Sequence, residues 1–440
     1  MKQGTFFEGD EVGGNKQYNL RSNLDFSFID NLDISLDVSL RQQDVTNSNV
    51  RYAAVFQTSA LTSPLLPKFI NDDPRYPAAG RASQNPIAMF RAKGYNENDR
   101  MNQTIIGNFT YRIPGLEGLS IGGFASGAFA NDDYKNFDIP WTYYVPNMDD
   151  PSGTPVAQQA GQLKLEQGHD KSRLVTGNLN VKYVKTINEH SIDGLFQVEK
   201  QTYRRDYYNA GNDDFLSSAS DYFDSASTSR DASWVSGAAE ETARISYSGR
   251  LNYNYKGKYM LQALFRYDGS EKFAEGKRFG FFPGVSGAWL ISEEDFLKEN
   301  STLSLKVKAS WGQLGNDRIP AYNYLSRYVF GNSTVVNGKT ITGVRESGSS
   351  NPDVTWEVTE SLNLGVEASF NKLWLEVNLF DMQTKDILAT PQLTLPQYTG
   401  IQPPNQNIGQ HQNRGFELET MYRDKICDFN FAIGGNVSYT

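Results

Sequence analysis

The sequence predicts an all-β protein built from antiparallel strands, and three features support this fold class. Apolar and polar residues alternate one by one over many segments, which places the apolar residues on one face of a strand. A comparable stripe with the 3.6-residue period of an amphipathic helix is not evident. Tight turns and long irregular stretches follow one another between the alternating segments. Aromatic residues, which make up 13% of the 440 residues, recur near the segment ends.

The composition excludes several other classes of protein. A net charge of −9 does not favour a nucleic-acid-binding protein, which would carry a basic face. No run of apolar residues approaches the roughly 18 that a membrane-spanning helix needs. One cysteine rules out an internal disulfide and, together with three histidines, a cysteine-rich zinc site. We therefore expect no nucleic-acid partner, no metal and no cofactor.

Six segments show the clearest alternation, and each is predicted to be a strand. They are residues 32–40, 179–183, 251–255, 303–311, 373–380 and 429–433. In the fourth segment, Leu305, Val307 and Ala309 alternate with Lys306 and Lys308. The apolar residues of such a strand face one side and the lysines face the other.

The connections point to the kind of β structure. Tight turns are predicted at 30–31, 115–118, 188–189, 256–258 and 371–372, and long irregular stretches at 43–101, 131–172, 204–240, 315–354 and 383–413. Loops beyond about 12–15 residues are uncommon in compact domains. Outer-membrane barrels, in contrast, have short periplasmic turns and long extracellular loops. We therefore expect an antiparallel transmembrane β-barrel, with Val307 facing lipid and Lys308 facing the lumen. A soluble β-sandwich also alternates apolar and polar residues, so it stays open as an alternative.

Short motifs in a fixed order make the sequence recognisable. They are Asn-Leu-Arg-Ser-Asn-Leu-Asp at 19–25, Asn-Pro at 85–86, Tyr-Arg-Ile-Pro-Gly-Leu at 111–116, Arg-Phe-Gly-Phe-Phe-Pro at 278–283, Ser-Trp-Gly-Gln-Leu-Gly-Asn at 310–316, Asn-Pro-Asp-Val-Thr-Trp-Glu at 351–357, Thr-Lys-Asp-Ile-Leu at 384–388, Asn-Ile-Gly at 407–409 and Asn-Arg-Gly-Phe-Glu-Leu at 413–418. Each motif is weak alone. Together they span nearly the whole chain, and the set resembles the SusC-like (SusC/RagA) branch of TonB-dependent outer-membrane transporters.

This resemblance implies a function and a location. It implies a protein of the outer membrane that imports glycans or peptides and is not an enzyme. A SusD-like surface lipoprotein would cover the long loops, and TonB would act through parts that we do not expect in this chain. Family members carry a signal peptide, a plug domain and a barrel of about 22 strands. We therefore expect residues 1–440 to be a partial barrel domain of about 14–15 strands, without signal peptide, plug or C-terminal strands.

Two other functions remain open from the sequence alone. The first is a soluble, secreted all-β carbohydrate-binding module or glycan-active enzyme. The second is a surface adhesin, in which a barrel presents loops that only bind. A plug domain would argue against the adhesin, and solubility without detergent would favour the module.

Chemical motifs in the sequence are weak. Gly-Lys-Thr at 338–340 resembles the end of a phosphate-binding loop, but the glycine needed five residues earlier is Ser333. The acidic pair at 132–133 is expected in an exposed loop rather than at a calcium site. Trp356 is expected to anchor at a membrane interface. No metal-ligand spacing relates the three histidines, which are His169, His190 and His411.

Two aromatic clusters are the best candidates for contact with a substrate. Trp141, Tyr143 and Tyr144 lie in one predicted loop, and Tyr207 and Tyr208 lie in the next. Flat aromatic faces suit sugar rings or peptide side chains, and tyrosine tolerates a wet site. The alternative is that these side chains pack the loops together.

Overall fold

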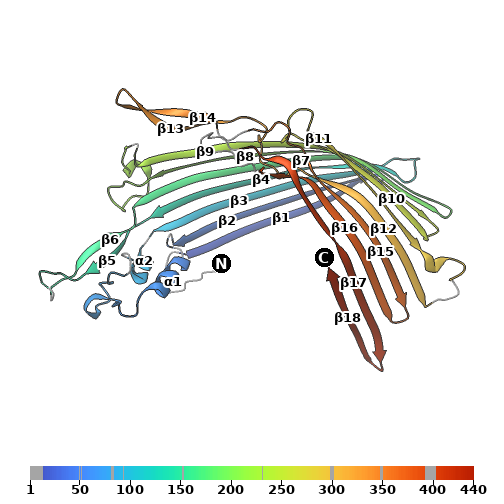
Figure 1. The fold of residues 1–440 in the computed structure, drawn as a ribbon, viewed down its shortest axis with the longest axis horizontal. Coiled ribbons are helices and arrows are strands. Elements are labelled where there is room, and N and C mark those ends of the chain that lie inside the picture. Colours follow the sequence, from blue (N-terminus) through green and yellow to red (C-terminus); the bar gives the residue numbers. More distant parts are fainter. Residues whose placement is uncertain are drawn as a thin grey trace.

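The computed structural model describes residues 13–48, 50, 52–80, 84–92, 94–150, 153–229, 231–297, 302–346, 350–391 and 403–440. In this part of the chain, 14 antiparallel strands form one sheet, and two separate ribbons of two strands each accompany it (Figure 1). The predicted fold class and strand number are therefore confirmed. Figure 1 also shows that the sheet curls, so that β15 to β18 run at a steep angle to β1 to β4.

The sheet strands follow in chain order. They are β1 (Gly13–Ile29), β2 (Leu32–Ser48), β3 (Tyr95–Arg112), β4 (Leu119–Asp138), β7 (Lys164–Ile187), β8 (His190–Asn212), β9 (Ser233–Tyr255), β10 (Tyr259–Ser270), β11 (Phe279–Leu290), β12 (Leu303–Asn316), β15 (Glu357–Phe370), β16 (Leu373–Ala389), β17 (Gln406–Ile426) and β18 (Phe429–Tyr439). The ribbons are β5 (Trp141–Val145) with β6 (Val156–Ala160), and β13 (Tyr328–Val336) with β14 (Lys339–Glu346). The helices are α1 (Tyr52–Leu61) and α2 (Pro86–Arg91), with 3-10 turns at Ile70–Asp72, Phe223–Ser225 and Ile291–Glu293.

Tight turns close several of the hairpins where the sequence predicts them. Asn188, Lys256 and Asn371 adopt left-handed backbone conformations, with φ of 55°, 57° and 53°. Positive φ is what a two-residue hairpin turn requires, and asparagine tolerates it better than most residues. The long connections lie at the opposite ends of the strands. In Figure 1, α1, α2, β5 and β6 gather together at that end of β2 to β4.

The sheet has one apolar and one polar face. Leu364 of β15 pairs with Ala309 of β12 and with Leu379 of β16, and this row continues the apolar face across three strands. The side chains of Leu364 and Leu379 are 47% and 52% exposed, which in a membrane means contact with lipid. Lys308 lies on the opposite, concave face, and its neighbour Val307 lies on the apolar face. Val307 and Lys308 thus lie on opposite faces as predicted, and contact of Val307 with lipid stays a prediction.

Several strands are longer than the sequence predicts. β7 has 24 residues, whereas about 9–11 tilted residues cross a membrane. The predicted irregular stretch 131–172 is therefore wrong at both ends, because β4 and β7 extend into it. Polar pairs between strands hold these extensions, as between Arg100 Nε and Asp132 Oδ2 at 3.0 Å. The acidic pair at 132–133 accordingly lies in β4 and not in a loop.

The sheet is open within the described part of the chain. Among the described strands, β1 pairs only with β2, and β18 pairs only with β17. In the described residues, no helix is long and apolar enough to cross a membrane.

Candidate functional site

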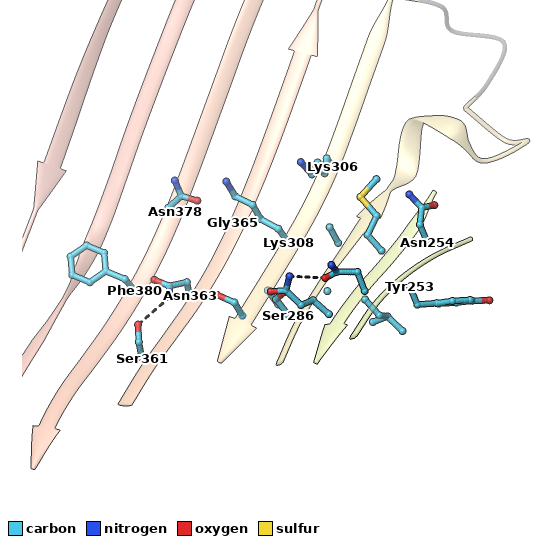
Figure 2. A pocket seen from close by; sticks show the side chains of 18 of the residues that line it. Tyr253, Asn254, Ser286, Lys306, Lys308, Ser361, Asn363, Gly365, Asn378 and Phe380 are labelled. Carbon is cyan, nitrogen blue, oxygen red and sulfur yellow. Dashed lines mark hydrogen bonds between the residues drawn. The ribbon is translucent and has the colours of Figure 1, made fainter. Parts of the chain in front are cut away.

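A polar hollow of about 1000 Å³ lies on the concave face of the sheet, between β8 and β17 (Figure 2). Amides and hydroxyls dominate its lining, including Asn252, Gln262, Ser286, Ser310, Asn363 and Asn378. Neighbouring strands hold these groups through hydrogen bonds. Gln262 Nε2 donates to Asn252 Oδ1 at 2.7 Å, and Asn363 Nδ2 donates to Ser310 Oγ at 3.4 Å. The concave face thus presents amides and hydroxyls together with a few charged side chains.

The lysines of this hollow are paired with carboxylates. Lys308 Nζ donates to Glu376 Oε1, and Asn378 Nδ2 donates to the same oxygen at 2.9 Å. Lys306 Nζ lies 3.6 Å from Glu367 Oε2. In each pair the carboxylate offsets the charge of the lysine. The wall therefore stays polar but does not attract a charged solute strongly at these positions. Among the described residues, no group of three or more acidic, histidine or cysteine side chains could hold a metal ion.

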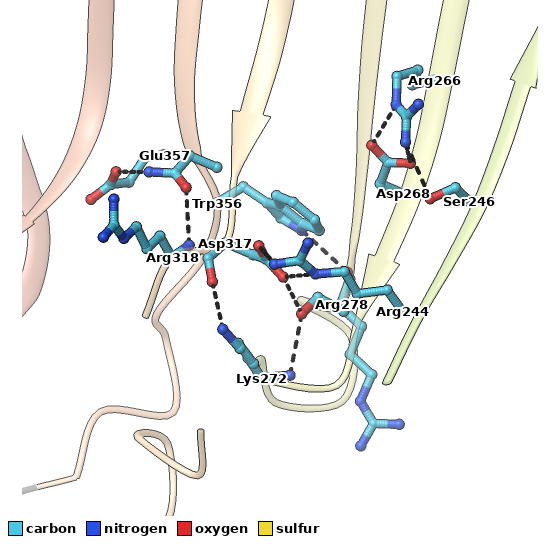
Figure 3. A network of polar contacts seen from close by, with 12 residues as sticks. Arg244, Ser246, Arg266, Asp268, Lys272, Arg278, Asp317, Arg318, Trp356 and Glu357 are labelled. Carbon is cyan, nitrogen blue, oxygen red and sulfur yellow. Dashed lines mark hydrogen bonds and ion pairs between the residues drawn. The ribbon is translucent and has the colours of Figure 1, made fainter. Parts of the chain in front are cut away.

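A buried carboxylate ties together the middle of β9 and the loop ends of β10 and β12 (Figure 3). Asp317 follows β12 and is only 5% exposed. Arg244 Nε of β9 donates to its Oδ2 at 2.7 Å, and Ser270 Oγ at the end of β10 donates to the same atom at 2.8 Å. Lys272 Nζ donates to the Asp317 carbonyl oxygen at 3.4 Å. Charge-assisted hydrogen bonds compensate for the burial of the carboxylate, so this network fixes the connections that follow β10 and β12.

An apolar cluster packs beside this network. The Trp356 ring lies 5.1 Å from the Phe273 ring and 5.4 Å from the Phe282 ring, and Trp356 Nε1 donates to the Arg278 carbonyl oxygen at 3.1 Å. Trp356 is 7% exposed, so its predicted role as an interface anchor is wrong. The Phe282 ring also covers Gly315. A Cβ at Gly315 would lie 1.9 Å from that ring.

The first predicted aromatic cluster lies in and around β5. Tyr143 is 7% exposed, and its hydroxyl donates to Gln158 Oε1 of β6 at 2.8 Å. The Tyr144 ring stands edge-on to Tyr76 at 5.0 Å, while the Tyr144 amide donates to the Pro77 carbonyl oxygen at 2.8 Å. These contacts join β5 to the connection between β2 and β3. They match the alternative in which aromatic side chains pack loops together. Substrate contact by Trp141, Tyr143 and Tyr144 stays a prediction.

The second predicted cluster is divided between two faces. Tyr207 and Tyr208 are neighbours on β8, so their side chains point to opposite sides of the sheet. Tyr207 lies on the concave face, with the Arg205 guanidinium 5.1 Å from its ring centre. Tyr208 lies on the outer face, 5.9 Å from the His169 ring. Only Tyr207 is therefore placed to meet a solute inside the barrel, and its contact with substrate stays a prediction.

An ion pair anchors the connection between β8 and β9. Asp221 Oδ2 lies 2.6 Å from Lys135 Nζ of β4 and also accepts the Tyr95 hydroxyl of β3. The hydrogen bond from Lys135, followed by that from Tyr95, holds the pKa of the Asp221 carboxyl below its usual range. Lys135 Nζ also lies 4.6 Å from the centre of the Tyr222 ring. The charged form of Asp221 therefore stabilises the folded connection.

Sequence reasoning did not identify the Asp317 network or the apolar cluster beside it. Both depend on residues that are far apart in the chain, from Arg244 to Trp356. The one available signal was the break in alternation at 279–282, where two consecutive phenylalanines, Phe281 and Phe282, place one ring on each face of the strand. A bulky ring at such a position requires a partner with no side chain, and Gly315 is that partner.

These features define a class of protein. A curved antiparallel sheet with an apolar outer face, a wet inner face and long connections gathered at one end is the wall of an outer-membrane β-barrel. The family described as TonB dependent receptor-like, beta-barrel, matches residues 41–440. The chain belongs to this family.

Individual relatives agree with this assignment. The chain is 29% identical over 422 residues to TonB-dependent receptor P26 of Formosa agariphila, an alignment that covers 93% of the chain and 40% of that receptor. It is 26% identical over 387 residues to the TonB-dependent receptor SusC of Bacteroides thetaiotaomicron, covering 84% of the chain and 36% of SusC. The RagAB peptide importer in its closed-closed state shares the fold, with a TM-score of 0.78 at 21% identity, over 97% of this chain and 46% of that one. The chain thus spans less than half the length of each relative.

The expected family, cellular location and class of protein are confirmed by these relatives. They confirm the resemblance to SusC-like receptors, and they place the protein in the outer membrane. The family is one of receptors and transporters and not a class of enzymes. A soluble all-β module fits neither this family nor the exposed apolar face of the sheet.

Proposed function

We propose that this chain forms part of the wall of an active transporter that imports glycans or peptides. A SusD-like surface lipoprotein would deliver the substrate at the long connections, and TonB would supply the energy. The observation that carries the proposal is the concave hollow, whose amides, hydroxyls and paired charges can exchange hydrogen bonds with a polar solute. The names of the relatives SusC and RagAB peptide importer support the same class of function.

We further propose that residues 1–440 contribute a partial barrel domain to a larger, plugged barrel. Two observations support this. Among the strands that the structure describes, the sheet is open at β1 and β18, and unpaired strand edges are costly in a membrane, where no water satisfies the backbone. The chain also spans less than half of the length of its relatives. The remaining strands of the parent receptor would close the barrel.

Uptake by the complete receptor tests this function. Cells that carry the receptor and its lipoprotein would be given fluorescently labelled oligosaccharides and oligopeptides, with and without TonB. We expect one of the two classes to accumulate inside the cells only when TonB is present. Binding at the surface that never leads to TonB-dependent accumulation would contradict import and favour the adhesin.

A matched pair of variants connects uptake to the hollow. Asn363→Leu removes an amide from the hollow, whereas Leu364→Ile changes the adjacent residue on the outer face. We expect uptake to fall several-fold for the first variant and to stay unchanged for the second, at equal amounts of folded barrel. Equal uptake by both variants would contradict a role for this wall in contact with the substrate.

A further inference from the structure

Four cations gather on the outer face of the sheet, beyond the apolar residues of β7 and β8. Lys171 and Arg173 of β7 share this face with Val175, and Lys200 and Arg204 of β8 share it as well, because the register of the two strands is unbroken. Arg173 and Arg204 stand directly opposite each other. Like charges in such a cross-strand pair destabilise a sheet, so the pair needs a negative partner.

The nearby carboxylates do not balance these charges. Arg204 Nε lies 2.8 Å from Asp206 Oδ2, and Arg204 Nη1 lies 3.7 Å from Glu241 Oε2. Within the described part of the chain, Lys171, Arg173 and Lys200 form no ion pair, and all three are exposed. Two carboxylates, Asp206 and Glu241, thus lie within ion-pair distance of the four cations, and both contact Arg204.

An apolar furrow leads to the same patch. Gly107 of β3, Ala125 of β4 and Gly177 of β7 lie side by side in one row, and the next residue of that row, on β8, is Lys200. Their small side chains leave a furrow of about 550 Å³ in a face that is otherwise bulky. Its apolar walls include Phe109, Leu179 and Val198. A hydrocarbon chain could lie in this furrow with its polar end against Lys200.

The height of the patch matches the outer leaflet. Lys200 is ten residues beyond His190, where β8 leaves its tight turn. At about 3.3 Å per residue and a tilt of about 40°, Lys200 lies about 25 Å above that turn, which is the height of the apolar band of such barrels. Arg204 and Arg173 lie still further toward the long connections, which are extracellular in such barrels.

We propose that this site binds a phosphorylated acyl lipid of the outer leaflet. Arg173, Lys200 and Arg204 hold the phosphate, and one acyl chain fills the furrow beside Gly177. Guanidinium groups bind phosphate oxygens through two parallel hydrogen bonds, and a bound phosphate removes the repulsion between the facing arginines. The lipid would be retained by charge and by shape together, which distinguishes it from the bulk lipid around the barrel.

Native mass spectrometry of the complete receptor, stripped of lipid in detergent, tests the charge. The probes are monophosphorylated lipid A, the same lipid after removal of its phosphate, and inorganic phosphate. We expect the phosphorylated lipid to bind at least tenfold more tightly than the dephosphorylated one, and millimolar phosphate not to displace it. Equal binding of both lipids would overturn the proposal. Displacement by inorganic phosphate would overturn it in favour of a site for free anions.

Variants test the residues. Replacing Arg173, Lys200 and Arg204 together by alanine should weaken binding of the phosphorylated lipid at least tenfold, whereas replacing both arginines by lysine should retain most of it. Lys185→Ala, which removes an outward cation of β7 near the tight turn, should leave binding unchanged. Unchanged binding by the triple variant would overturn the proposal.

A second variant tests the furrow without touching a charge. A Cβ at Gly177 meets nothing within 4 Å, so Gly177→Leu can fill the furrow while β7 keeps its course. We expect this variant to weaken lipid binding several-fold. Gly435→Leu is the matched control, because Gly435 of β18 is equally open. Equal lipid binding by both variants would overturn the assignment of the acyl chain to the furrow.

Discussion

Lysine at position 307 tests the orientation of the whole sheet. Val307 is the third of five outward residues on β12, which are Leu303, Leu305, Val307, Ala309 and Trp311. Successive outward residues are about 6.6 Å apart along the strand, or about 5 Å along the membrane normal at a tilt of about 40°. Val307 thus lies about 10 Å from either end of this apolar segment. A lysine near the membrane centre costs about 2–4 kcal/mol, compared with about 0–1 kcal/mol near an interface.

Two substitutions on the concave face serve as controls. Ser310→Lys adds the same charge to β12, but its side chain enters the wet hollow. Lys308→Ala removes the partner of Glu376 on that face, where water can replace the lost contact. We expect both to cost less than about 1 kcal/mol, the usual value of an ion pair in contact with solvent.

The measurement is the folded fraction of the complete receptor. Heat-modifiable gel mobility separates folded from unfolded barrel, and equilibrium unfolding in denaturant gives the free energy. Val307→Lys should lower the ratio of folded to unfolded protein about 30-fold to 900-fold, because about 1.4 kcal/mol corresponds to a factor of ten. Equal losses for Val307→Lys and Ser310→Lys would refute the assignment of the two faces.

Three further predictions concern the loop end of the sheet and the candidate site. Gly315→Ala should lower the free energy of unfolding by about 1–3 kcal/mol, because its Cβ would meet the buried Phe282 ring. Gly107→Ala is the control and should not lower it, because the space around that Cβ is open. Equal stability of the two variants would contradict this packing. Asp221→Asn should speed proteolysis of the 213–232 connection at pH 7 through the loss of a charge-assisted hydrogen bond of about 1.5 kcal/mol. Because the pKa of Asp221 is lowered in the folded state, the unsubstituted connection should stay protected until the pH falls below about 4, and loss of protection near pH 6 would speak against the ion pair. Tyr207→Ala should reduce substrate uptake several-fold, and Tyr208→Ala on the outer face should leave it unchanged; the reverse order would contradict their placement.

The wall of the barrel could be predicted from the sequence because it follows local rules. The alternation around Val307 and Lys308 fixes which face each residue takes, and the structure has the same faces. Residues that tolerate positive φ, such as Asn188 and Asn371, mark the tight turns. Each of these signals depends on a few consecutive residues, so no knowledge of distant contacts was needed.

The extensions of the strands and the loop cluster could not be predicted in the same way. Above the membrane both faces of β4 and β7 meet water, so alternation disappears, and Asp132 with its neighbours resembles loop sequence. Pairing with the next strand, as between Arg100 and Asp132, is what continues the sheet there. Likewise, Trp356 gives no sign in the sequence that Phe273 and Phe282 lie beside it, because more than 70 residues separate them from it.

In the described part of the chain, every strand of the main sheet pairs only with its neighbours in chain order within that sheet, while β5, β6, β13 and β14 lie in the connections. Such a meander affects how the protein can change during evolution. A hairpin can be gained, lost or exchanged in one step without rerouting any other strand, and the connections at one rim can diverge while the wall stays intact. The connections at the rim can therefore evolve to recognise a different ligand, while the wall that inserts into the membrane stays the same.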